Sequence, residues 1–183
     1  AVTLFEHDNV GQITKYISPN SVEIRYHYDQ ARRLTSIVDG LGSSVEYALD
    51  LLGNRLATEI KNAEGAVSFS HSYQYDKLGQ LVKSISPYSQ EVGYGYDFNG
   101  QQILYSDGFG QVWTKSIDSL RRLVKETDPD GFSAQYTYDN ADRISKVTDQ
   151  RGLETEYSYD AFGNILSQTS PDTGLVEYGY DLA

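Results

Sequence analysis

The sequence contains no cysteine, no methionine, one tryptophan and four prolines. Without cysteine, a disulfide framework, a thiolate metal site and a cysteine nucleophile are all excluded. Long apolar runs are also missing, and residues 1–20 lack a basic start followed by an apolar core, so we expect neither a membrane span nor a signal peptide in this sequence. We expect it to be a piece of a longer protein whose signal lies elsewhere.

Basic residues are scarce as well. Lysine and arginine together number 15 against 26 aspartates and glutamates, which gives a formal net charge of −11. Binding to nucleic acid or to an anionic membrane surface requires a basic face, so this charge argues against both partners. Helical periodicity is missing too, because apolar residues do not recur at spacings of three and four over any long window. No helix is expected.

What the sequence has in abundance is a repeat. The stretch Tyr157–Ile165, with the sequence YSYDAFGNI, returns in variant form along the whole chain. Its aspartate recurs at intervals of 21 residues, with one interval of 26 between Asp50 and Asp76. A fixed period of this length is typical of a repeat array. The register positions are Asp8, Asp29, Asp50, Asp76, Asp97, Asp118, Asp139, Asp160 and Asp181.

The chemistry of the unit predicts a β-hairpin. Tyr157 and Tyr159 alternate with small residues, so both rings should lie on one face of a strand. Asp160 and Gly163 then occupy the first and last positions of a four-residue turn, where the carboxylate accepts a backbone N–H and glycine adopts a left-handed conformation. A second turn closes each interval, as in Asp107–Gly110 and Asp128–Gly131.

We therefore interpret these residues as a structural repeat motif, with no catalytic and no metal-binding member. The motif residues are Tyr26, Tyr28, Asp29, Asp50, Gly53, Tyr73, Tyr75, Asp76, Gly79, Tyr94, Tyr96, Asp97, Gly100, Asp118, Tyr136, Tyr138, Asp139, Tyr157, Tyr159, Asp160, Gly163, Tyr178, Tyr180 and Asp181.

Some units depart from the pattern. Arg32, Arg121 and Asp142 stand where glycine is expected, and holding such residues left-handed costs about 1 kcal/mol each, so we expect these turns to be of another type. Two units, at 47–56 and 94–103, carry one extra residue before their apolar position, which a β-bulge would absorb. The five additional residues of the long interval are expected in a longer surface turn around Lys61–Gly65, within a longer repeat near 61–66.

Two strands and two turns per unit predict an all-β chain of about 16 to 18 strands. We expect residues 1–183 to form one array of about eight repeats, arranged as a long antiparallel ribbon of hairpins that curls. Tyrosines of successive repeats should form ladders across it.

The motif Tyr-x-Tyr-Asp-x-x-Gly-[Asn/Gln/Arg]-[Leu/Ile] at a spacing of 21, followed by Asp-x-x-Gly, resembles the RHS repeat, also called the YD repeat. Bacterial polymorphic toxins, components of insecticidal ABC toxin complexes, wall-associated bacterial proteins and animal teneurins carry such repeats. The resemblance implies a segment of a hollow, spiral β-shell, which in the toxins encloses a C-terminal cytotoxic polypeptide. It also implies a secreted or cell-surface bacterial protein. The Pro- and Asp-rich core segment of the toxin members, with its autoproteolytic aspartates, has no counterpart here.

Candidate chemistry has a structural alternative in each case. The repeated aspartates could be acids or Ca²⁺ ligands, but their identical recurrence favours turn formation. Asp128–Gly131 is the best Ca²⁺ candidate and lacks the downstream ligands of a calcium loop. His7, His27 and His71 lie in strand patterns without a third metal ligand, and no Gly-x-Ser-x-Gly motif is present. We expect no cofactor and no enzymatic activity.

Two functions remain open. The first is a wall segment whose partners are the rest of its own shell and an enclosed C-terminal passenger, such as a toxin. The second is an extracellular module that binds carbohydrate or mediates cell adhesion, as in teneurins, with a cell-surface glycan as its partner. The high tyrosine content is compatible with both, since 13 of the 16 tyrosines occupy the paired positions of the motif.

Overall fold

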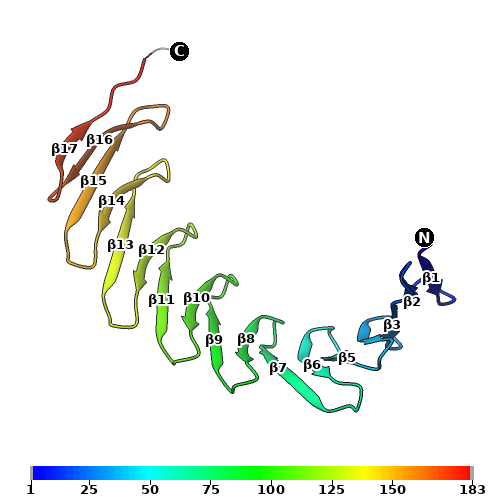
Figure 1. Cartoon of the computed structure of the whole chain (residues 1–183). Helices are drawn as coiled ribbons and strands as arrows, with labels where there is room; N and C mark the ends of the chain where they lie inside the picture. Colours follow the sequence, from blue (N-terminus) through cyan, green and yellow to red (C-terminus); the bar gives the residue numbers. More distant parts are fainter. Residues whose placement is uncertain (1, 182–183) are drawn as a thin grey trace. The chain divides into compact units, whose positions relative to one another are not determined.

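The computed structural model describes residues 2–181, and all regular structure in this range is β-strand (Figure 1). Ala1, Leu182 and Ala183, the ends of the expected array, lie outside the described residues. The number of strands in this range, 17, agrees with the expected 16 to 18. The strands are β1 (Leu4–His7), β2 (Ile13–Ile17), β3 (Glu23–Tyr28), β4 (Leu34–Asp39), β5 (Ser44–Leu49), β6 (Arg55–Lys61), β7 (Val67–Tyr75), β8 (Leu81–Ile85), β9 (Glu91–Tyr96), β10 (Gln102–Ser106), β11 (Val112–Ile117), β12 (Leu123–Thr127), β13 (Ser133–Tyr138), β14 (Ile144–Thr148), β15 (Glu154–Tyr159), β16 (Ile165–Ser170) and β17 (Gly174–Glu177).

Each strand pairs with the strand that follows it in the sequence. The antiparallel pairing runs from β1–β2 to β8–β9 and from β10–β11 to β16–β17, and β9 and β10 pair as well. Hydrogen bonds between sequence neighbours are typical of a hairpin ribbon. The predicted all-β ribbon of antiparallel hairpins is confirmed.

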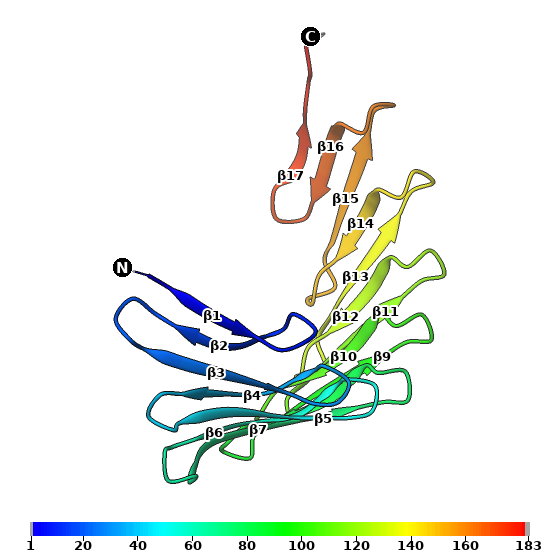
Figure 2. The same cartoon turned by 90° about the vertical axis from the view of Figure 1, so that its right-hand side faces the viewer.

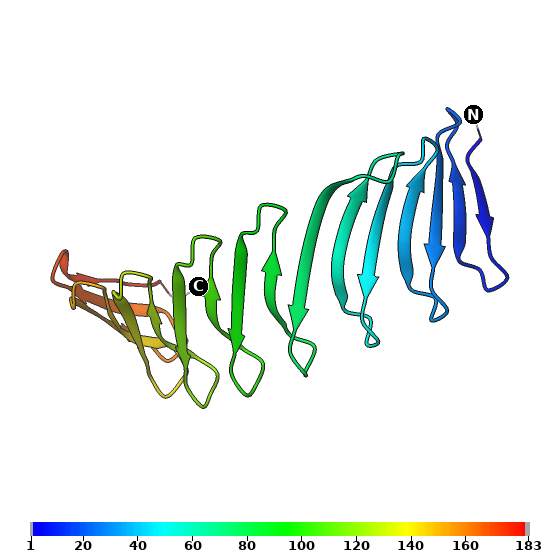
Figure 3. The ribbon, with the colours of Figure 1, turned by 90° about the horizontal axis from the view of Figure 1, so that it is seen from below.

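The chain divides into two compact units between Gly93 and Tyr94, so β9 crosses the boundary. In the N-terminal unit, β1 to β8 lie side by side with tight turns at both strand ends (Figure 2). In the C-terminal unit, β10 to β17 show the same arrangement (Figure 1), and Figure 3 shows its green strands from below. Each unit is therefore a stack of hairpins in one layer.

Two kinds of turn alternate along both units. We call those that follow the tyrosine strands YD turns; they begin at Asp8, Asp29, Asp50, Asp76, Asp97, Asp118, Asp139 and Asp160. We call the others return turns; seven of them begin at Ser18, Asp39, Asn62, Ser86, Asp107, Asp128 and Asp149, and a further one joins Ser170 of β16 to Gly174 of β17. Because consecutive strands are antiparallel, the two kinds lie at opposite strand ends.

The two faces of the sheet differ in composition. Cross-strand partners share a face, and Tyr26 stands opposite Ile37, which stands opposite Val45. Tyr136 likewise stands opposite Val147. On the other face lie the ion pairs Lys15–Glu23, Lys61–Glu46, Lys83–Glu91 and Lys146–Glu154, with N–O distances of 3.2, 2.6, 2.7 and 2.9 Å. We call them the aromatic face and the polar face.

Neither face is covered by a second layer of the described chain. No apolar side chain among residues 2–181 is buried, and the one buried polar residue is Ser84. Domains normally pack two layers around a core, so a one-layer sheet obtains its stability from contacts between neighbouring repeats. Ring contacts contribute on the aromatic face, with centroid distances of 5.4 Å for Phe5–Tyr16 and 4.7 Å for His71–Tyr73.

The prediction of a longer turn around Lys61–Gly65 is wrong. The turn from Asn62 to Gly65 has the same hydrogen bonds as the other return turns: Gly65 N–H donates to the Asn62 carbonyl at 2.9 Å, and Asn62 N–H to the Ala66 carbonyl at 3.0 Å. The additional residues lengthen the strands instead, since β6 has 7 residues and β7 has 9. Asn62 replaces the turn aspartate because its side-chain oxygen also accepts a backbone N–H, here from Ala66.

The β-bulge expected in the unit at 47–56 is present between Ala48 and Leu49, but an extra residue is not its cause. In β15–β16, where nothing is inserted, Ser158 pairs with Ser167 and Tyr159 with Ile165, so Leu166 is the bulged residue. The same register shift recurs in β1–β2, β3–β4, β7–β8, β11–β12 and β13–β14. The bulge therefore belongs to the YD hairpin itself.

Candidate functional site

The feature that recurs within each unit is the junction between one YD turn and the next. In each YD turn the aspartate side chain accepts backbone N–H groups that the strands leave unpaired. Asp160 Oδ1 accepts from Phe162 and Asn164, both at 2.8 Å, and Asp50 Oδ1 accepts from Leu52 and Asn54 at 2.9 and 2.8 Å. A turn followed by a left-handed residue and a bulge is a common three-residue hairpin loop.

The other register aspartates accept the same kind of hydrogen bond. Each accepts the N–H of the residue four positions later, at 2.9 to 3.0 Å. These are Asp8, Asp29, Asp76, Asp97, Asp118 and Asp139. The last unit differs: Tyr178, Tyr180 and Asp181 follow β17 outside any strand, although Tyr178 N–H still donates to the Leu166 carbonyl at 2.9 Å.

The expectation that turns without glycine are of another type is wrong. Arg32, Arg121 and Asp142 have φ values of 64°, 66° and 62°, in the same left-handed region as Gly53, Gly79, Gly100 and Gly163. Their backbone N–H groups donate to the backbone carbonyls of the turn aspartates at 2.9, 3.0 and 3.2 Å, as the glycine N–H groups do. The hydrogen bonds of the turn therefore fix the conformation. The fourth residue of the turn is left-handed even where it is not glycine, and this conformation is strained.

Each of these three left-handed residues is followed by a contact that compensates for the backbone strain. The next residue is in each case an arginine, Arg33, Arg122 or Arg143, whose Nε donates to the turn aspartate at 2.7 or 2.8 Å. Charge-assisted hydrogen bonds of this kind are about twice as strong as neutral ones. The YD turns that keep glycine have asparagine or glutamine at that position instead. The three YD turns with a strained, left-handed residue other than glycine are thus the ones that contain an ion pair between arginine and aspartate.

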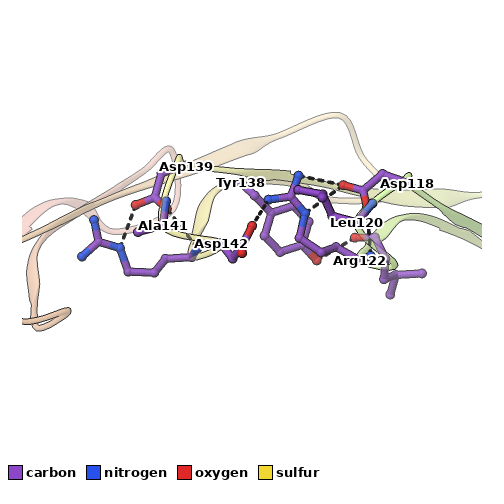
Figure 4. A network of polar contacts seen from close by, with 9 residues as sticks. Asp118, Leu120, Arg122, Tyr138, Asp139, Ala141 and Asp142 are labelled. Atoms are coloured by element: carbon purple, nitrogen blue, oxygen red, sulfur yellow. Dashed lines mark hydrogen bonds and ion pairs between the residues drawn. The ribbon is translucent and has the colours of Figure 1, made fainter.

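The same arginines connect successive repeats, as Figure 4 illustrates for Arg122. Arg122 Nη1 bonds Asp142 Oδ1 in the next YD turn at 2.6 Å, and its guanidinium lies 4.5 Å from the centroid of the Tyr138 ring. Arg143 donates to the Asp160 carbonyl at 2.9 Å and lies 4.6 Å from the Tyr159 ring centroid. Arg33 donates to the Asp50 carbonyl at 2.6 Å.

Glutamine at this position makes a similar connection. Gln12 Nε2 donates to the Arg32 carbonyl at 3.0 Å, and Gln101 Nε2 to the Arg121 carbonyl at 3.4 Å. Arginine at this position, and glutamine at Gln12 and Gln101, therefore connects neighbouring repeats, whereas Asn54 and Asn164 donate to the aspartate of their own turn. The motif includes Asn, Gln or Arg there, but the sequence did not reveal which of these side chains cross to the neighbouring repeat.

The second tyrosine of the motif supplies another connection. Tyr159 OH donates to the Ile144 carbonyl at 2.7 Å, and Ile144 pairs with Tyr138, the equivalent tyrosine of the preceding repeat. The acceptor lies beside the bulge, where the regular strand pairing is interrupted. Equivalent bonds join Tyr28 to Ile13, Tyr75 to Arg55, Tyr138 to Leu123 and Tyr180 to Ile165, at 2.8, 3.1, 2.7 and 3.0 Å.

The first tyrosine makes contacts that vary between repeats. Tyr136 OH donates to Glu126 Oε1 at 2.6 Å, and this bond, together with burial, raises the pKa of Tyr136 to about 12. Tyr73 stacks on His71, and Tyr94 lies 5.9 Å from Tyr105. Tyr26 and Tyr157 lie opposite Ile37 and Gln168. Tyr96 ends β9 at the position of the second tyrosine.

Five of the YD-turn carboxyl groups have a pKa below their ordinary value, which favours their charged form. The backbone N–H of the residue four positions on lowers the pKa of Asp29, Asp118 and Asp139, and the paired arginine side chain lowers it further. For Asp50 and Asp160 the first cause is the asparagine side chain, Asn54 or Asn164. Depressed pKa values make these groups poor proton donors near neutral pH.

The other candidates for chemistry are dispersed. Within residues 2–181 no three His, Asp or Glu side chains come together as a group that could hold a metal ion. His7, His27 and His71 lie in β1, β3 and β7. Asp128, the calcium candidate, uses Oδ1 to accept from Asp130 and Phe132 and Oδ2 to accept from Gln150 at 3.2 Å. Nor does any helix that could cross a membrane occur in this part of the chain.

One pocket on the aromatic face is lined by rings. It has a volume of about 350 Å³ and is lined by Gln102, Ile103, Leu104, Tyr105, Trp113 and Lys115. The ring centroids of Tyr105 and Trp113 are 5.5 Å apart. No motif in the sequence marks this pocket, because Tyr105 and Trp113 both lie outside the paired tyrosine positions.

Comparison with known proteins supports a single family. The model of the RHS repeat matches residues 7–44, 118–152 and 138–175, which together make up more than half of the chain. No curated protein matches the sequence. Solved structures match the fold, among them a crystal structure of TcdB2–TccC3–Cdc42 with 12% identity and a TM-score of 0.52, covering 92% of this chain and 11% of that chain.

A structure of the Photorhabdus luminescens Tc holotoxin pore, with a substitution in TccC3, matches with 12% identity and a TM-score of 0.52, covering 95% of this chain and 12% of that chain. The sequence thus spans about a ninth of the chains that it matches, and at this identity the likeness concerns the fold alone. The family-model matches and the regular YD hairpins agree, and the chain belongs to the RHS-repeat family.

Proposed function

We propose that this chain is a structural, non-enzymatic segment of an RHS-type shell that encloses and shields a C-terminal polypeptide, such as a toxin. In this proposal residues 1–183 form one repeat array, and the motif tyrosines, aspartates and glycines build its wall. The observation that carries the proposal is a one-layer sheet without a buried apolar core in residues 2–181, in which side chains of the YD hairpins bond neighbouring repeats within each unit.

The difference between the two faces supports a wall. The polar face carries ion pairs that water solvates well, whereas the aromatic face presents half-buried rings and aliphatic side chains with no covering layer in residues 2–181. A face of apolar and aromatic side chains without a covering layer is typical of an interaction site. We propose that the aromatic face is the side turned toward the enclosed polypeptide.

The chemistry of the site also supports a structural role. The turn carboxylates lie in successive turns rather than in one cleft, and hydrogen bonds lower the pKa of Asp139 and Asp160 among them. Paired catalytic carboxylates require different environments, which identical turns do not provide. The named neighbours are Tc toxin assemblies, and by analogy we propose a secreted or cell-surface location.

Limited proteolysis of the full-length protein that contains these repeats tests the proposal. We expect its C-terminal polypeptide to survive a protease dose that digests the same polypeptide produced alone. In a variant whose residues 94–181 are replaced by a flexible linker, the wall is opened and the polypeptide should be digested at the rate of the isolated form. Equal digestion with and without the repeats would contradict enclosure.

The pocket at Trp113 favours a second function, binding of a cell-surface glycan. Tyr105 and Trp113 offer ring faces on which a sugar can stack, and Lys115 offers a cation for an acidic sugar. We expect a glycan array or a heparin column to show retention that Trp113→Ala abolishes and Tyr157→Ala, on the same face, preserves. Absence of retention, or equal retention of both variants, would remove this function.

A further inference from the structure

The pocket at Trp113 lies where the repeat departs most from its motif. In the repeats before and after it the two paired positions hold tyrosines, whereas here they hold Lys115 and Ile117. The one tryptophan of the chain, Trp113, lies two residues before Lys115 on β11, and Tyr105 stands opposite it on β10. A pocket with two rings and a lysine thus takes the place of a tyrosine pair on the aromatic face.

Lys115 has no ion partner among the residues that the structure describes, although Glu126 stands directly opposite it on β12. The Glu126 carboxylate is bonded elsewhere, because its Oε1 accepts a hydrogen bond from the Tyr136 hydroxyl at 2.6 Å. Four lysines of the polar face each pair with a glutamate: Lys15, Lys61, Lys83 and Lys146. The Lys115 ammonium is therefore available to an anion from outside the chain.

Tyr136 explains why Glu126 does not pair with Lys115. Opposite charges at directly paired positions of neighbouring strands normally attract each other. A hydrogen bond from a hydroxyl to a carboxylate is charge-assisted and about twice as strong as a neutral one. Because Tyr136 lies on β13 and Lys115 on β11, this bond holds the carboxylate of the intervening strand on the side away from the lysine.

The lining of the pocket suits a sugar that carries a carboxylate. Its volume of about 350 Å³ has room for a single ring, and the Tyr105 and Trp113 rings offer faces on which a pyranose can stack. Gln102 offers an amide that can donate to and accept from sugar hydroxyls. Since the net charge of −11 repels anions, an acidic ligand requires a cation at the site, and Lys115 supplies one.

We propose that this pocket binds a carboxylated pyranose, such as a uronic acid unit of a glycan, with its carboxylate on Lys115 and its ring on Trp113 and Tyr105. In the same proposal Tyr136 is a positioning residue that leaves Lys115 available by holding Glu126. This inference rests on the second proposed function, glycan binding. It adds the class of sugar and a residue outside the pocket that controls the charge within it.

Fluorescence of Trp113 measures the occupancy of the pocket, because the chain has no other tryptophan. The ligands are methyl glucuronide and methyl glucoside, which differ only in a carboxylate in place of a hydroxymethyl group. We expect the 183-residue chain to bind the glucuronide about tenfold more tightly, the usual effect of a hydrogen bond to a charged group. Saturation-transfer NMR of the sugar protons repeats the measurement from the side of the ligand.

Lys115→Gln should remove this preference by lowering the affinity for the glucuronide about tenfold and leaving that for the glucoside unchanged. The matched control is Lys125→Gln. Lys125 is exposed, lacks an ion partner among the described residues and lies on the polar face of β12, where it stands opposite Ser116. This variant should bind both sugars as the wild type does.

Tyr136→Phe tests the positioning role. The variant releases Glu126 to pair with Lys115, so the affinity for the glucuronide should fall about threefold while that for the glucoside stays the same. Adding Glu126→Gln to this variant should restore the affinity, because no carboxylate then competes for the lysine. A general loss of packing would not be repaired in this way.

The outcomes separate this inference from the function on which it rests. Equal affinity for both sugars would leave glycan binding intact and overturn the acidic class. If neither sugar bound, the inference and the second function would both fall, and binding of an acidic peptide instead would assign the pocket to a polypeptide. An unchanged affinity in Tyr136→Phe, or a loss that Glu126→Gln does not restore, would overturn the role of Tyr136.

Discussion

At the scale of single residues, the aspartate of the motif forms the turn and the tyrosine connects the repeats. Asp160 satisfies two N–H groups within its own hairpin, whereas Tyr159 bonds a carbonyl of the hairpin before it. Backbone groups at a bulge lack their regular partner, and leaving such a group unpaired costs stability. The hydroxyl of the second tyrosine therefore explains why tyrosine, rather than phenylalanine, stands beside the aspartate.

Replacing that hydroxyl gives the first prediction. Tyr159→Phe removes the 2.7 Å bond to the Ile144 carbonyl while keeping the ring under Arg143. We expect a loss of about 1 kcal/mol in the free energy of unfolding, the usual worth of such a bond. Urea denaturation measures it.

Tyr157→Phe, two residues earlier on the same face, is the control for that experiment. Among the described residues the Tyr157 hydroxyl has no hydrogen-bond partner, so its removal should change stability by less than about 0.5 kcal/mol. If both variants lose the same free energy, the connecting role of the hydroxyl is wrong.

At the scale of the hairpin, the sequence predicted most of the architecture. The aspartate period placed the strands and both kinds of turn because the tyrosine alternation and the turn residues repeat in register. The prediction of a longer turn around Lys61–Gly65 was wrong, although the sequence Asn62–Gly65 has the form of the other return turns, with Asn in place of Asp. Recognising it would have moved the additional residues into β6 and β7.

The connections between hairpins were not predictable from spacing. Arg143 lies 17 residues before its acceptor Asp160, and Tyr159 lies 15 residues after Ile144. Which side chain reaches which turn depends on the twist of neighbouring strands and on the bulge, and both are properties of the folded sheet. For the same reason the left-handed corners of Arg32, Arg121 and Asp142 were judged too costly, because the arginine contacts that accompany them were unknown.

The charged turns predict a dependence on acid. The pKa values of Asp29, Asp118 and Asp139 lie below the ordinary value of 3.8. A carboxyl whose pKa is lower in the folded state stabilises the fold above its unfolded pKa, and this contribution is lost as the pH falls through the folded value. Stability should therefore be flat near neutral pH and decline below about pH 4.

Urea midpoints measured from about pH 7 down to about pH 2 check this dependence. The triple variant Asp29→Asn/Asp118→Asn/Asp139→Asn should be less stable than the wild type at neutral pH, because the arginine ion pairs are gone. Its deficit should shrink as the wild-type carboxylates become protonated. A deficit that stays constant down to about pH 2 would show that charge is not what the aspartates contribute.

At the scale of the whole molecule, stability is a sum over repeats and the junctions between them, because residues 2–181 have no common core. In such an array a whole repeat can be removed without loss of the remaining junctions. Removal of a single strand is different, since every later YD turn then changes to the opposite strand end. The unit of this protein is therefore the pair of strands with its 21-residue period, and the connector residues require that period.

Two deletions in the C-terminal unit test this view. Deleting residues 140–160 joins Asp139 to Ala161 and restores a complete YD turn, so we expect a folded chain, although Gly163 then replaces Asp142, the acceptor of Arg122. Its urea m-value should fall by about a tenth, in proportion to the surface lost. Deleting residues 140–149 also leaves a turn sequence, Asp139 followed by Gln150, Arg151 and Gly152, but places the connectors at the wrong edge. The shorter deletion should therefore destabilise the chain more than the longer one does, and the opposite order would mean that strands, rather than repeats, are the cooperative unit.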